Sequence, residues 1–220
     1  MMKIKRRKNL EMIIQNISAH PNPKVELEQY STPANIASDI LWNGYTLGDI
    51  KDMNIVDLGC GTGIFSISSA LLGAKKVLAI DIDEESLKSA KKQSQHIGVD
   101  SEKISFFQKD LCEISSIQDL DINGFLEKSN TLIQNPPFGS QERGKKHIDR
   151  KFIEIAMESA EVIYSFHMKS THNFVYDYFE SLGGKITHEF LYKFPIKKIY
   201  DFHNKESVDV EVIVFRVENF

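Results

Sequence analysis

The chain has 220 residues, of which 41% are hydrophobic and 26% are charged, and its formal net charge at pH 7 is −4. This composition is that of a folded globular protein and excludes bulk disorder, and the length suits one sizeable core rather than two. The negative charge excludes binding to nucleic acid over the whole surface, so any such contact must be local, at basic clusters such as residues 3–8, 143–151 or 193–198.

No stretch of the sequence has the pattern of a targeting or membrane segment. The basic start is followed by residues 10–17, which are interrupted by polar side chains, unlike the apolar part of a signal peptide. No run reaches the roughly 18 apolar residues of a membrane span. The two cysteines, Cys60 and Cys112, lack the C-x-x-C spacing of a zinc site. We therefore expect a cytoplasmic protein with reduced cysteines, no bound metal and no membrane segment.

The N-terminal region predicts two helices. Apolar residues recur at helical spacing between Leu10 and Ile17, which predicts a helix over residues 4–18 that ends before the turn sequence H-P-N-P. Thr32 followed by Pro33 then has the pattern of an N-cap and first helical residue, so a second helix is expected to begin there.

From residue 54 onward, short apolar runs alternate with helical stretches. This alternation predicts an α/β fold, in which a parallel sheet is covered by helices on both faces. The last part differs, because residues 186–194 and the alternating valines between 208 and 214 predict an antiparallel strand pair. The predicted strands of the first part cover residues 55–58, 77–80, 104–107 and 131–134, and the predicted helices cover 64–72, 84–97 and 150–160.

A glycine-rich turn, V-D-L-G-C-G-T-G over residues 56–63, follows the first predicted strand. Glycines there allow tight turns and close approach of a ligand, but the G-x-G-x-G spacing differs from the G-x-G-x-x-G of dinucleotide-binding proteins. The Asp57 carboxylate would repel a pyrophosphate and attract an ammonium or sulfonium group, which favours S-adenosylmethionine over NAD. The residues of the turn that we expect to bind the cofactor are Asp57, Gly59, Gly61, Thr62 and Gly63.

Acidic residues follow the next two predicted strands. Asp81 ends the second strand, where a carboxylate can accept hydrogen bonds from both ribose hydroxyls, and Asp83 competes for that role. Asp110 follows the third strand and can accept from the adenine amine of the cofactor. Helix capping or a solvated loop charge is the alternative for Asp81 or Asp110 taken alone. Their placement at successive strand ends favours cofactor binding.

The fourth predicted strand leads into the sequence N-P-P-F, Asn135 to Phe138. An adenine amine is a poor nucleophile because its lone pair is delocalised into the ring, so an enzyme must localise that pair. The side-chain carbonyl of Asn135 and the backbone carbonyl of Pro136 can accept the two N–H bonds, while Pro136 and Pro137 fix the backbone and Phe138 stacks on the base. A proline-rich turn is the alternative, but the position after a cofactor loop favours catalysis.

Together these stretches are similar to the adenine N6-methyltransferase family that modifies a ribosomal RNA of the small subunit, a class I Rossmann-like group. The likeness extends from about residue 24 to the end of the chain. It is carried by L-E-Q-Y-S-T (27–32), D-L-G-C-G (57–61), D-I-D (81–83), N-P-P-F-G (135–139), Y-S-F-H (164–167), K-S-T (169–171), F-H-N-K (202–205) and S-V-D-V-E-V (207–212).

The resemblance implies one domain over residues 1–220, with a helical extension over 1–23 and a catalytic core over 24–220 built on a mostly parallel seven-stranded sheet. It implies S-adenosyl-L-methionine as methyl donor, S-adenosyl-L-homocysteine as product and ribosomal RNA as substrate. It also implies that Gln29 and Thr32 fold over the cofactor, although Ser31 stands where the family usually has a proline. Eukaryotic members pair strand to strand with a small zinc-binding activator subunit, so a heterodimer is a further hypothesis.

Other functions fit the same sequence less well. Glutamine amide methyltransferases of release factors also use an N-P-P-aromatic motif, but typically with tyrosine in fourth place and a larger N-terminal domain. DNA adenine methylation would need a target-recognition domain. A non-catalytic RNA-binding or ribosome-assembly module would not need the complete set of acidic and N-P-P-F residues, and a nicotinamide-dependent oxidoreductase would need the wider glycine spacing.

Overall fold

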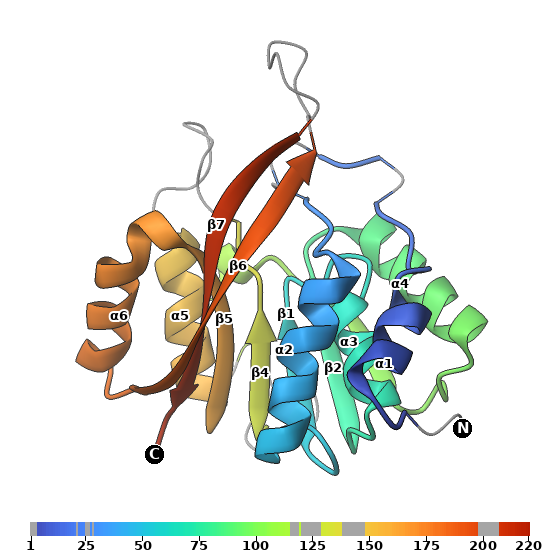
Figure 1. The fold of residues 1–220 in the computed structure, drawn as a ribbon, viewed down its shortest axis with the longest axis horizontal. Helices are drawn as coiled ribbons and strands as arrows, with labels where there is room; N and C mark the ends of the chain where they lie inside the picture. Colours follow the sequence, from blue (N-terminus) through green and yellow to red (C-terminus); the bar gives the residue numbers. More distant parts are fainter. Residues whose placement is uncertain are drawn as a thin grey trace.

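The structure of the chain is a computed structural model that describes residues 4–20, 22–24, 27, 29–114, 119, 129–137, 148–197 and 207–220. These residues form one central sheet from β1 (Asn54–Leu58), β2 (Lys76–Asp81), β3 (Ile104–Gln108), β4 (Thr131–Gln134), β5 (Val162–Met168), β6 (Lys185–Lys197) and β7 (Ser207–Glu218). Its strand order is β3-β2-β1-β4-β5-β7-β6 (Figure 1). Strands β1 to β5 are parallel, and β7 runs antiparallel to β5 and β6. The predicted fold class is confirmed.

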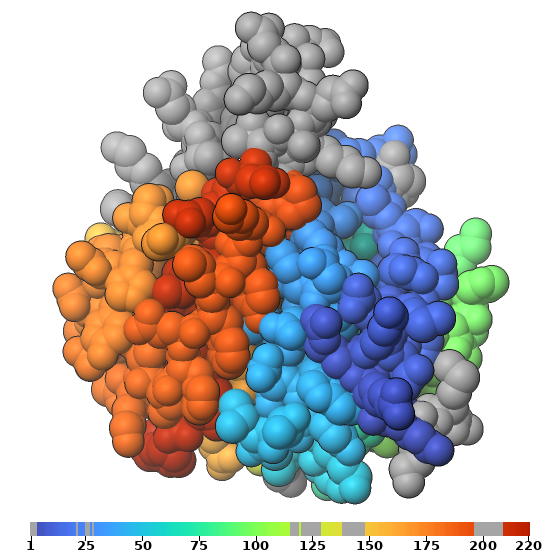
Figure 2. Space-filling view, in the orientation of Figure 1, coloured from blue at the N-terminus to red at the C-terminus, as the bar shows by residue number. Residues whose placement is uncertain are grey.

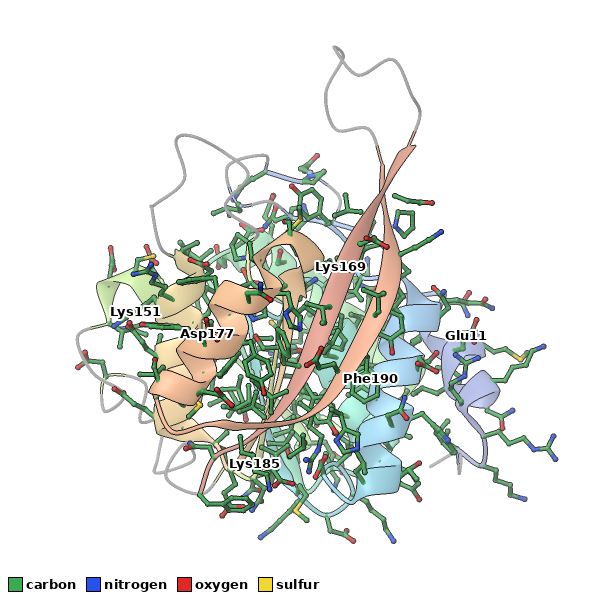
Figure 3. All side chains as sticks on the ribbon, turned by 60° about the vertical axis from the view of Figure 1, so that its left-hand side comes forward. Glu11, Lys151, Lys169, Asp177, Lys185 and Phe190 are labelled. Carbon is green, nitrogen blue, oxygen red and sulfur yellow. The ribbon has the colours of Figure 1, made fainter. Side chains whose placement is uncertain are left out.

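Helices cover both faces of the sheet. They are α1 (Arg7–Ile14), α2 (Ala34–Leu47), α3 (Ile64–Leu71), α4 (Glu84–Ile97), α5 (Ile148–Ser159) and α6 (His172–Ser181), with 3₁₀-helices η2 (Leu111–Glu113) and η5 (Lys169–Thr171). Because side chains alternate along a strand, Ile55 of β1 packs in the cluster with α1 to α4, and its neighbour Val56 packs in the cluster with α5 and α6. Figure 3 shows this division, with Glu11 on one side and Lys151 and Asp177 on the other.

Helix α1 and strand β6 both pack against α2. Leu10 and Ile14 of α1 are fully buried in the cluster that contains α2 and α3. The Tyr192 hydroxyl of β6 donates to the Asp39 carboxylate of α2 over 2.7 Å. The space-filling view accordingly shows the blue residues of α2 beside the orange residues of β6 (Figure 2). The N-terminal and C-terminal parts of the chain thus meet on one face.

Two predicted helix starts and ends differ from the structure. Helix α1 ends at Ile14 rather than near residue 18, because the next residues form a turn and the Ser18 N–H donates to the Gln93 side chain instead of continuing the helix. The N-cap of α2 is Pro33, with φ −59° and ψ 139°, so the predicted capping role of Thr32 is wrong. The Thr32 hydroxyl instead accepts from the Asn135 side chain.

A buried ion pair joins the C-terminal strands to α2. Arg216 of β7 donates from Nε to the Oδ2 atom of Asp49 over 2.8 Å and from Nη2 to Oδ1 over 3.0 Å. The Tyr164 hydroxyl of β5 donates to the same carboxylate over 2.6 Å. These contacts lie at the end of the sheet opposite the carboxyl ends of the parallel strands. Among the described residues, no helix is both long enough and apolar enough to cross a membrane.

Candidate active site

A cavity of about 340 Å³ lies at the carboxyl ends of the parallel strands. Its wall comes from the segment before α2, the glycine-rich turn after β1, the residues after β2 and β3, the loop after β4 and the start of α5. The fold therefore brings together residues as far apart as Thr32 and Asn135, which are 103 positions apart in the chain. The predicted site residues that line it are Gln29, Thr32, Gly59, Gly61, Thr62, Asp81, Asp110, Asn135 and Pro137.

The glycines of the turn have different surroundings. Gly59 and Gly61 line the cavity with φ of 70° and 52°, and a side chain at Gly61 would meet no described atom within 4 Å. Gly63 has φ 86° but faces away from the cavity: a Cβ there would lie 2.9 Å from the Cβ of Ala90. Gly63 therefore allows α3 to pack against α4. The sequence predicted instead that Gly63 contacts the cofactor.

The Asp57 side chain is also directed away from the cavity and is buried between β1 and α3. Its side chain is 1% exposed, Oδ2 accepts from the Ser66 hydroxyl of α3, and Oδ1 has no partner among the described residues. Burial raises the pKa of Asp57 to about 7, although the hydrogen bonds from Ser66 lower it. The lining that the structure describes does not include Asp57. The position beside the charged groups of a ligand, expected from the sequence, is therefore not seen, because the side chain points from β1 toward α3.

Asp81 is held at the rim of the glycine-rich turn. Its Oδ2 accepts from the Gly61 N–H over 2.7 Å, and its Oδ1 accepts from the Asp83 N–H over 2.8 Å. Both bonds fix the carboxylate, which lines the cavity and can accept further hydrogen bonds. Burial raises the pKa of Asp81, whereas the two backbone hydrogen bonds lower it. The arrangement is suited to accept hydroxyl protons from a ligand.

Asp83 and Asp110 have capping roles. Asp83 is the N-cap of α4 and accepts from the Ser86 N–H over 3.2 Å. Asp110 is the N-cap of η2, with its Oδ1 accepting from the Cys112 N–H over 2.8 Å, and it also lines the cavity. Asp83 is not among the described lining residues. Of Asp81 and Asp83, Asp81 is thus the one among the described residues that lines the cavity.

The Asn135 amide has a fixed orientation. Its Nδ2 donates to the Thr32 hydroxyl oxygen over 3.2 Å, so that its Oδ1 is directed elsewhere. This oxygen is buried and has no hydrogen-bond partner among the described residues. Buried acceptors are nearly always satisfied, so an open one beside a cavity indicates where a ligand donor binds. Thr32 therefore orients Asn135 in addition to lining the cavity.

The remaining residues of the predicted catalytic loop are only partly described. Pro137 lines the cavity, and Pro136 is buried without being part of the described lining. Phe138 lies outside the described residues, as do Arg143, Lys145 and Lys146 of the basic cluster that follows. The geometry of Phe138 toward a substrate base stays a prediction.

Sequence reasoning missed several apolar residues of the cavity. Ile82 is 40% exposed although it follows a buried strand, and together with Leu111 and Phe152 it lines the cavity. The sequence signal for Ile82 was its position between Asp81 and Asp83 at the end of a strand, because apolar side chains line most ligand pockets. Cys60 lines the cavity as well, and burial raises the pKa of its thiol well above the ordinary value, so it stays a neutral contact.

The chain is 32% identical to the rRNA N(6)-adenosine-methyltransferase METTL5 of Danio rerio, over 95% of this chain and 97% of that protein. The chain belongs to the METTL5 family. A crystal structure of a candidate RNA methyltransferase from Pyrococcus horikoshii matches the chain with a TM-score of 0.83 and 33% identity, over 98% of both chains. An uncharacterized protein of Methanocaldococcus jannaschii is 42% identical over 97% of this chain. The family model of ribosomal protein L11 methyltransferase (PrmA) matches residues 45–122.

As a member of the METTL5 family, the protein is an S-adenosylmethionine-dependent methyltransferase. The cavity fits this cofactor. The acidic Asp81 faces it beside the apolar side chain of Ile82, as a ribose and an adjoining flat base require, and the space over Gly61 is open to the amino-acid part.

Proposed function

We propose that this methyltransferase modifies the N6 atom of an adenosine in RNA, and that the RNA is that of the small ribosomal subunit. The observation that carries the proposal is the Asn135 amide, whose Nδ2 is bonded to Thr32 and whose buried Oδ1 is left without a partner among the described residues. An exocyclic amine supplies the N–H donor that such an acceptor requires. The name of the Danio rerio relative supports RNA adenosine as the acceptor.

The proposed reaction depends on localising the lone pair of the adenine amine. Bound S-adenosylmethionine supplies an electrophilic methyl group on a sulfonium. The Asn135 Oδ1 atom and the Pro136 carbonyl accept the two N–H bonds, which directs the nitrogen lone pair toward that methyl group. Pro136 and Pro137 keep the two acceptors in place, and Phe138 stacks on the base. The transfer is an in-line displacement: the bond from nitrogen to methyl forms as the bond from sulfur to methyl breaks, S-adenosylhomocysteine leaves, and the nitrogen then loses one proton to solvent. Such a step requires alignment more than a strong base.

The residues proposed for the cofactor site fall into three groups: some contact the cofactor, some cover it, and some support the site without contacting it. Asp81 accepts from the ribose hydroxyls, Asp110 accepts from the adenine amine, and Gly59, Gly61 and Thr62 contact the amino-acid part. Gln29 and Thr32 cover the cofactor from the segment before α2. Asp57 and Gly63 support the site without contacting the cofactor. The Asp57 side chain bonds to Ser66 and so joins β1 to α3, and Gly63 leaves room for α3 to pack against α4.

The proposed contact with RNA phosphates is local. Arg150 and Lys151 lie in the first turn of α5, the helix that follows the catalytic loop in the chain, and the Arg150 guanidinium lies 4.8 Å from the centroid of the Phe174 ring. Basic side chains in this position would neutralise phosphates next to the target nucleotide, which a chain with net charge −4 cannot do over its whole surface. Binding should therefore depend on salt only moderately.

We further propose that a small zinc-binding activator subunit pairs with the edge strand β3. Both β3 and β6 are edge strands. The edge strand β6 has the exposed charged residues Lys185 and Glu189, which oppose pairing, whereas β3 has the half-buried Phe106 and Phe107. A partner at β3 would cover these rings and could add basic surface near the site.

The test is transfer of labelled methyl from S-adenosylmethionine to total RNA, separated into small-subunit and large-subunit RNA, with and without the activator subunit. We expect label in N6-methyladenosine of the small-subunit RNA. Removal of one transition-state acceptor by Asn135→Ala should reduce the rate by about 100-fold or more. The control is Asn173→Ala, an exposed asparagine of α6, which should keep the wild-type rate.

Two outcomes would contradict the proposal. Label in a release-factor glutamine and none in any RNA would identify a protein amide as the acceptor, since an amide nitrogen poses the same lone-pair problem. Equal labelling by the wild type and Asn135→Ala would remove Asn135 from the mechanism, whatever the substrate.

A further inference from the structure

Asp83 accepts more hydrogen bonds than a helix cap needs. Its carboxylate is 3% exposed and begins α4, where it accepts from the Ser86 N–H over 3.2 Å and from the Ser86 hydroxyl over 3.0 Å. One such bond satisfies an N-cap. The remaining partners come from a segment about sixty positions earlier in the chain, between α1 and α2.

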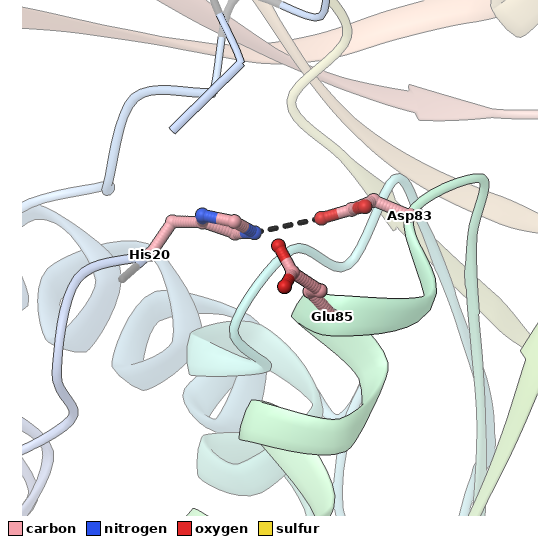
Figure 4. A group of neighbouring side chains, drawn as sticks. All are labelled: His20, Asp83 and Glu85. Carbon is pink, nitrogen blue, oxygen red and sulfur yellow. Dashed lines mark hydrogen bonds and ion pairs between the residues drawn. The ribbon is translucent and has the colours of Figure 1, made fainter. Parts of the chain in front are cut away.

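Three side chains of that segment converge on the one carboxylate. The Lys24 ammonium lies 2.5 Å from Oδ1, the His20 Nε2 atom lies 2.7 Å from Oδ2, and the Gln29 Nε2 atom donates to Oδ2 over 3.1 Å. Figure 4 shows the imidazole of His20 directed at the Asp83 carboxylate. Burial alone would raise the pKa of Asp83, but the hydrogen bonds from Lys24, Gln29 and His20 hold it well below its usual range. The carboxylate is therefore a stable anion.

The segment also bonds to itself in a way that orients these donors. The His20 Nδ1 atom accepts from the Asn22 N–H over 3.0 Å, so the ring proton is on Nε2 and faces Asp83. The Gln29 side-chain oxygen accepts from the Lys24 N–H over 2.8 Å, which leaves its Nε2 for the carboxylate. Each group thus has its donor directed at Asp83 before any ligand binds.

The same segment forms one wall of the cofactor cavity. His20, Gln29 and Thr32 all line it, while Asp83 itself is not among the described lining residues. In Figure 1 the chain between α1 and α2 runs over the beginning of α4, at the carboxyl edge of the sheet. The Asp83 N–H also donates to Oδ1 of Asp81 over 2.8 Å, so Asp83 is bonded directly to the proposed ribose acceptor.

We propose that Asp83 is a positioning residue, which fastens the described part of residues 20–32 against the cavity and thereby sets the affinity for S-adenosylmethionine. The inference concerns the cofactor and does not depend on the RNA substrate. Without the anchor, the wall would have to be ordered by the cofactor itself, and the cost of that ordering would appear as weaker binding.

A metal ion is the rival explanation of this cluster. Ligand atoms of His20, Asp83 and Glu85 lie within 4.8 Å of one another. However, the Lys24 ammonium already contacts Oδ1 of Asp83, and its charge opposes a cation at the same oxygen. Glu85 is exposed and, among the described residues, accepts no hydrogen bond from the other two, whereas His20 donates directly to Asp83. The contacts are those of a hydrogen-bonded anchor.

The first experiment is calorimetric binding of S-adenosylhomocysteine and S-adenosylmethionine to Asp83→Asn. Asparagine caps a helix as well as aspartate does, so α4 should keep its cap, while loss of the bonds to the charged carboxylate should lower the melting temperature. Loss of the charge-assisted bonds should raise both dissociation constants about tenfold. The matched control is Glu84→Gln, the same change of charge one residue later, where the carboxylate is exposed and pairs with Lys88 alone among the described residues.

Two further variants separate positioning from capping. Lys24→Met and His20→Phe leave the cap untouched. Each should weaken S-adenosylhomocysteine binding several-fold while the protein stays folded at the assay temperature, with faster hydrogen exchange in peptides covering residues 20–32. In assays with an acceptor, KM for the cofactor should rise while kcat changes little. Wild-type binding by Asp83→Asn and by both further variants would overturn the proposal. So would wild-type affinity that requires added Zn²⁺ and falls with a chelator.

Discussion

The two ends of the Asn135 side-chain amide have different surroundings: the nitrogen bonds to Thr32, and the oxygen has no partner among the described residues. The Thr32 hydroxyl accepts from Nδ2 over 3.2 Å, and this bond determines which end of the amide faces a substrate. The amide oxygen is therefore available as an acceptor only while Thr32 holds the nitrogen. In the proposed mechanism, a residue from the segment before α2 would thus orient the acceptor of a loop after β4.

Thr32→Val should reduce kcat of the methyltransferase by about tenfold, because valine keeps the shape of threonine but cannot accept from Asn135, so that the amide loses its orientation. The KM for RNA should change less. Steady-state methyl transfer at saturating cofactor measures both. Thr46→Val on α2 is the control, since its exposed hydroxyl bonds only to the Trp42 carbonyl among the described residues. A rate equal to that of the wild type would show that Asn135 is oriented by another contact.

Asp57 should make stability depend on pH. Burial raises its pKa from 3.8 to about 7 in the folded chain, so the folded state binds a proton that the unfolded state releases. The resulting stability is fully present below the unfolded pKa and is lost as pH rises toward 7. Between pH 5 and pH 8, the free energy of unfolding of the wild type relative to Asp57→Asn should therefore fall by about 2 kcal/mol. Urea titrations at both pH values measure this, and a difference independent of pH would contradict it.

The sequence predicted most members of the candidate site but not the directions of their side chains. Asp81, Gly61 and Asn135 face the cavity, as expected from their places at strand ends and turns. Asp57 and Gly63 belong to the same motif and face α3 and α4 instead. A motif gives the order of residues, whereas the face on which each side chain lies depends on the packing of helices far along the chain.

At the scale of the elements, local patterns determined the bounds of most strands and helices. Helix α4 spans the predicted residues because Asp83 caps its start and Gly98, with φ 82°, ends it. Strand β5 and helix α6 were not predicted. Their sequence mixes polar and aromatic residues without a clear period, and Ser165 and His167 are buried through contacts with other elements. Such burial is a property of the assembled sheet.

The C-terminal strands depend on one buried ion pair, and Arg216→Met should test this. The change leaves the Asp49 carboxylate buried beside Tyr164 without its cation, which should lower the free energy of unfolding by about 3–5 kcal/mol. Denaturant unfolding measures the loss. Lys169→Met is the control, because it breaks an exposed pair with Glu211 and should cost less than about 1 kcal/mol. Equal losses in the two variants would refute the special role of the buried pair.

Across the whole molecule, the order of the strands separates two parts of the site. The residues proposed to hold the cofactor all precede β4 in the chain and lie on the side of the sheet formed by β1, β2 and β3. The bond between Thr32 and Asn135 connects them to the part that follows β4. The acceptor loop, α5 and the β6–β7 pair follow β4. The sequence predicted parallel strands followed by an antiparallel pair, but it did not predict the order of the strands in the sheet, which depends on how the connections cross.

This separation has an evolutionary consequence. The family model of a methyltransferase that is named for a ribosomal protein matches residues 45–122. That stretch includes the glycine-rich turn, Asp81 and Asp110, and it ends before Asn135. The donor-binding residues proposed after β1, β2 and β3 therefore lie inside the matched stretch, and the proposed acceptor loop lies outside it. In evolution, a change of acceptor would thus fall mainly on the residues that follow this stretch.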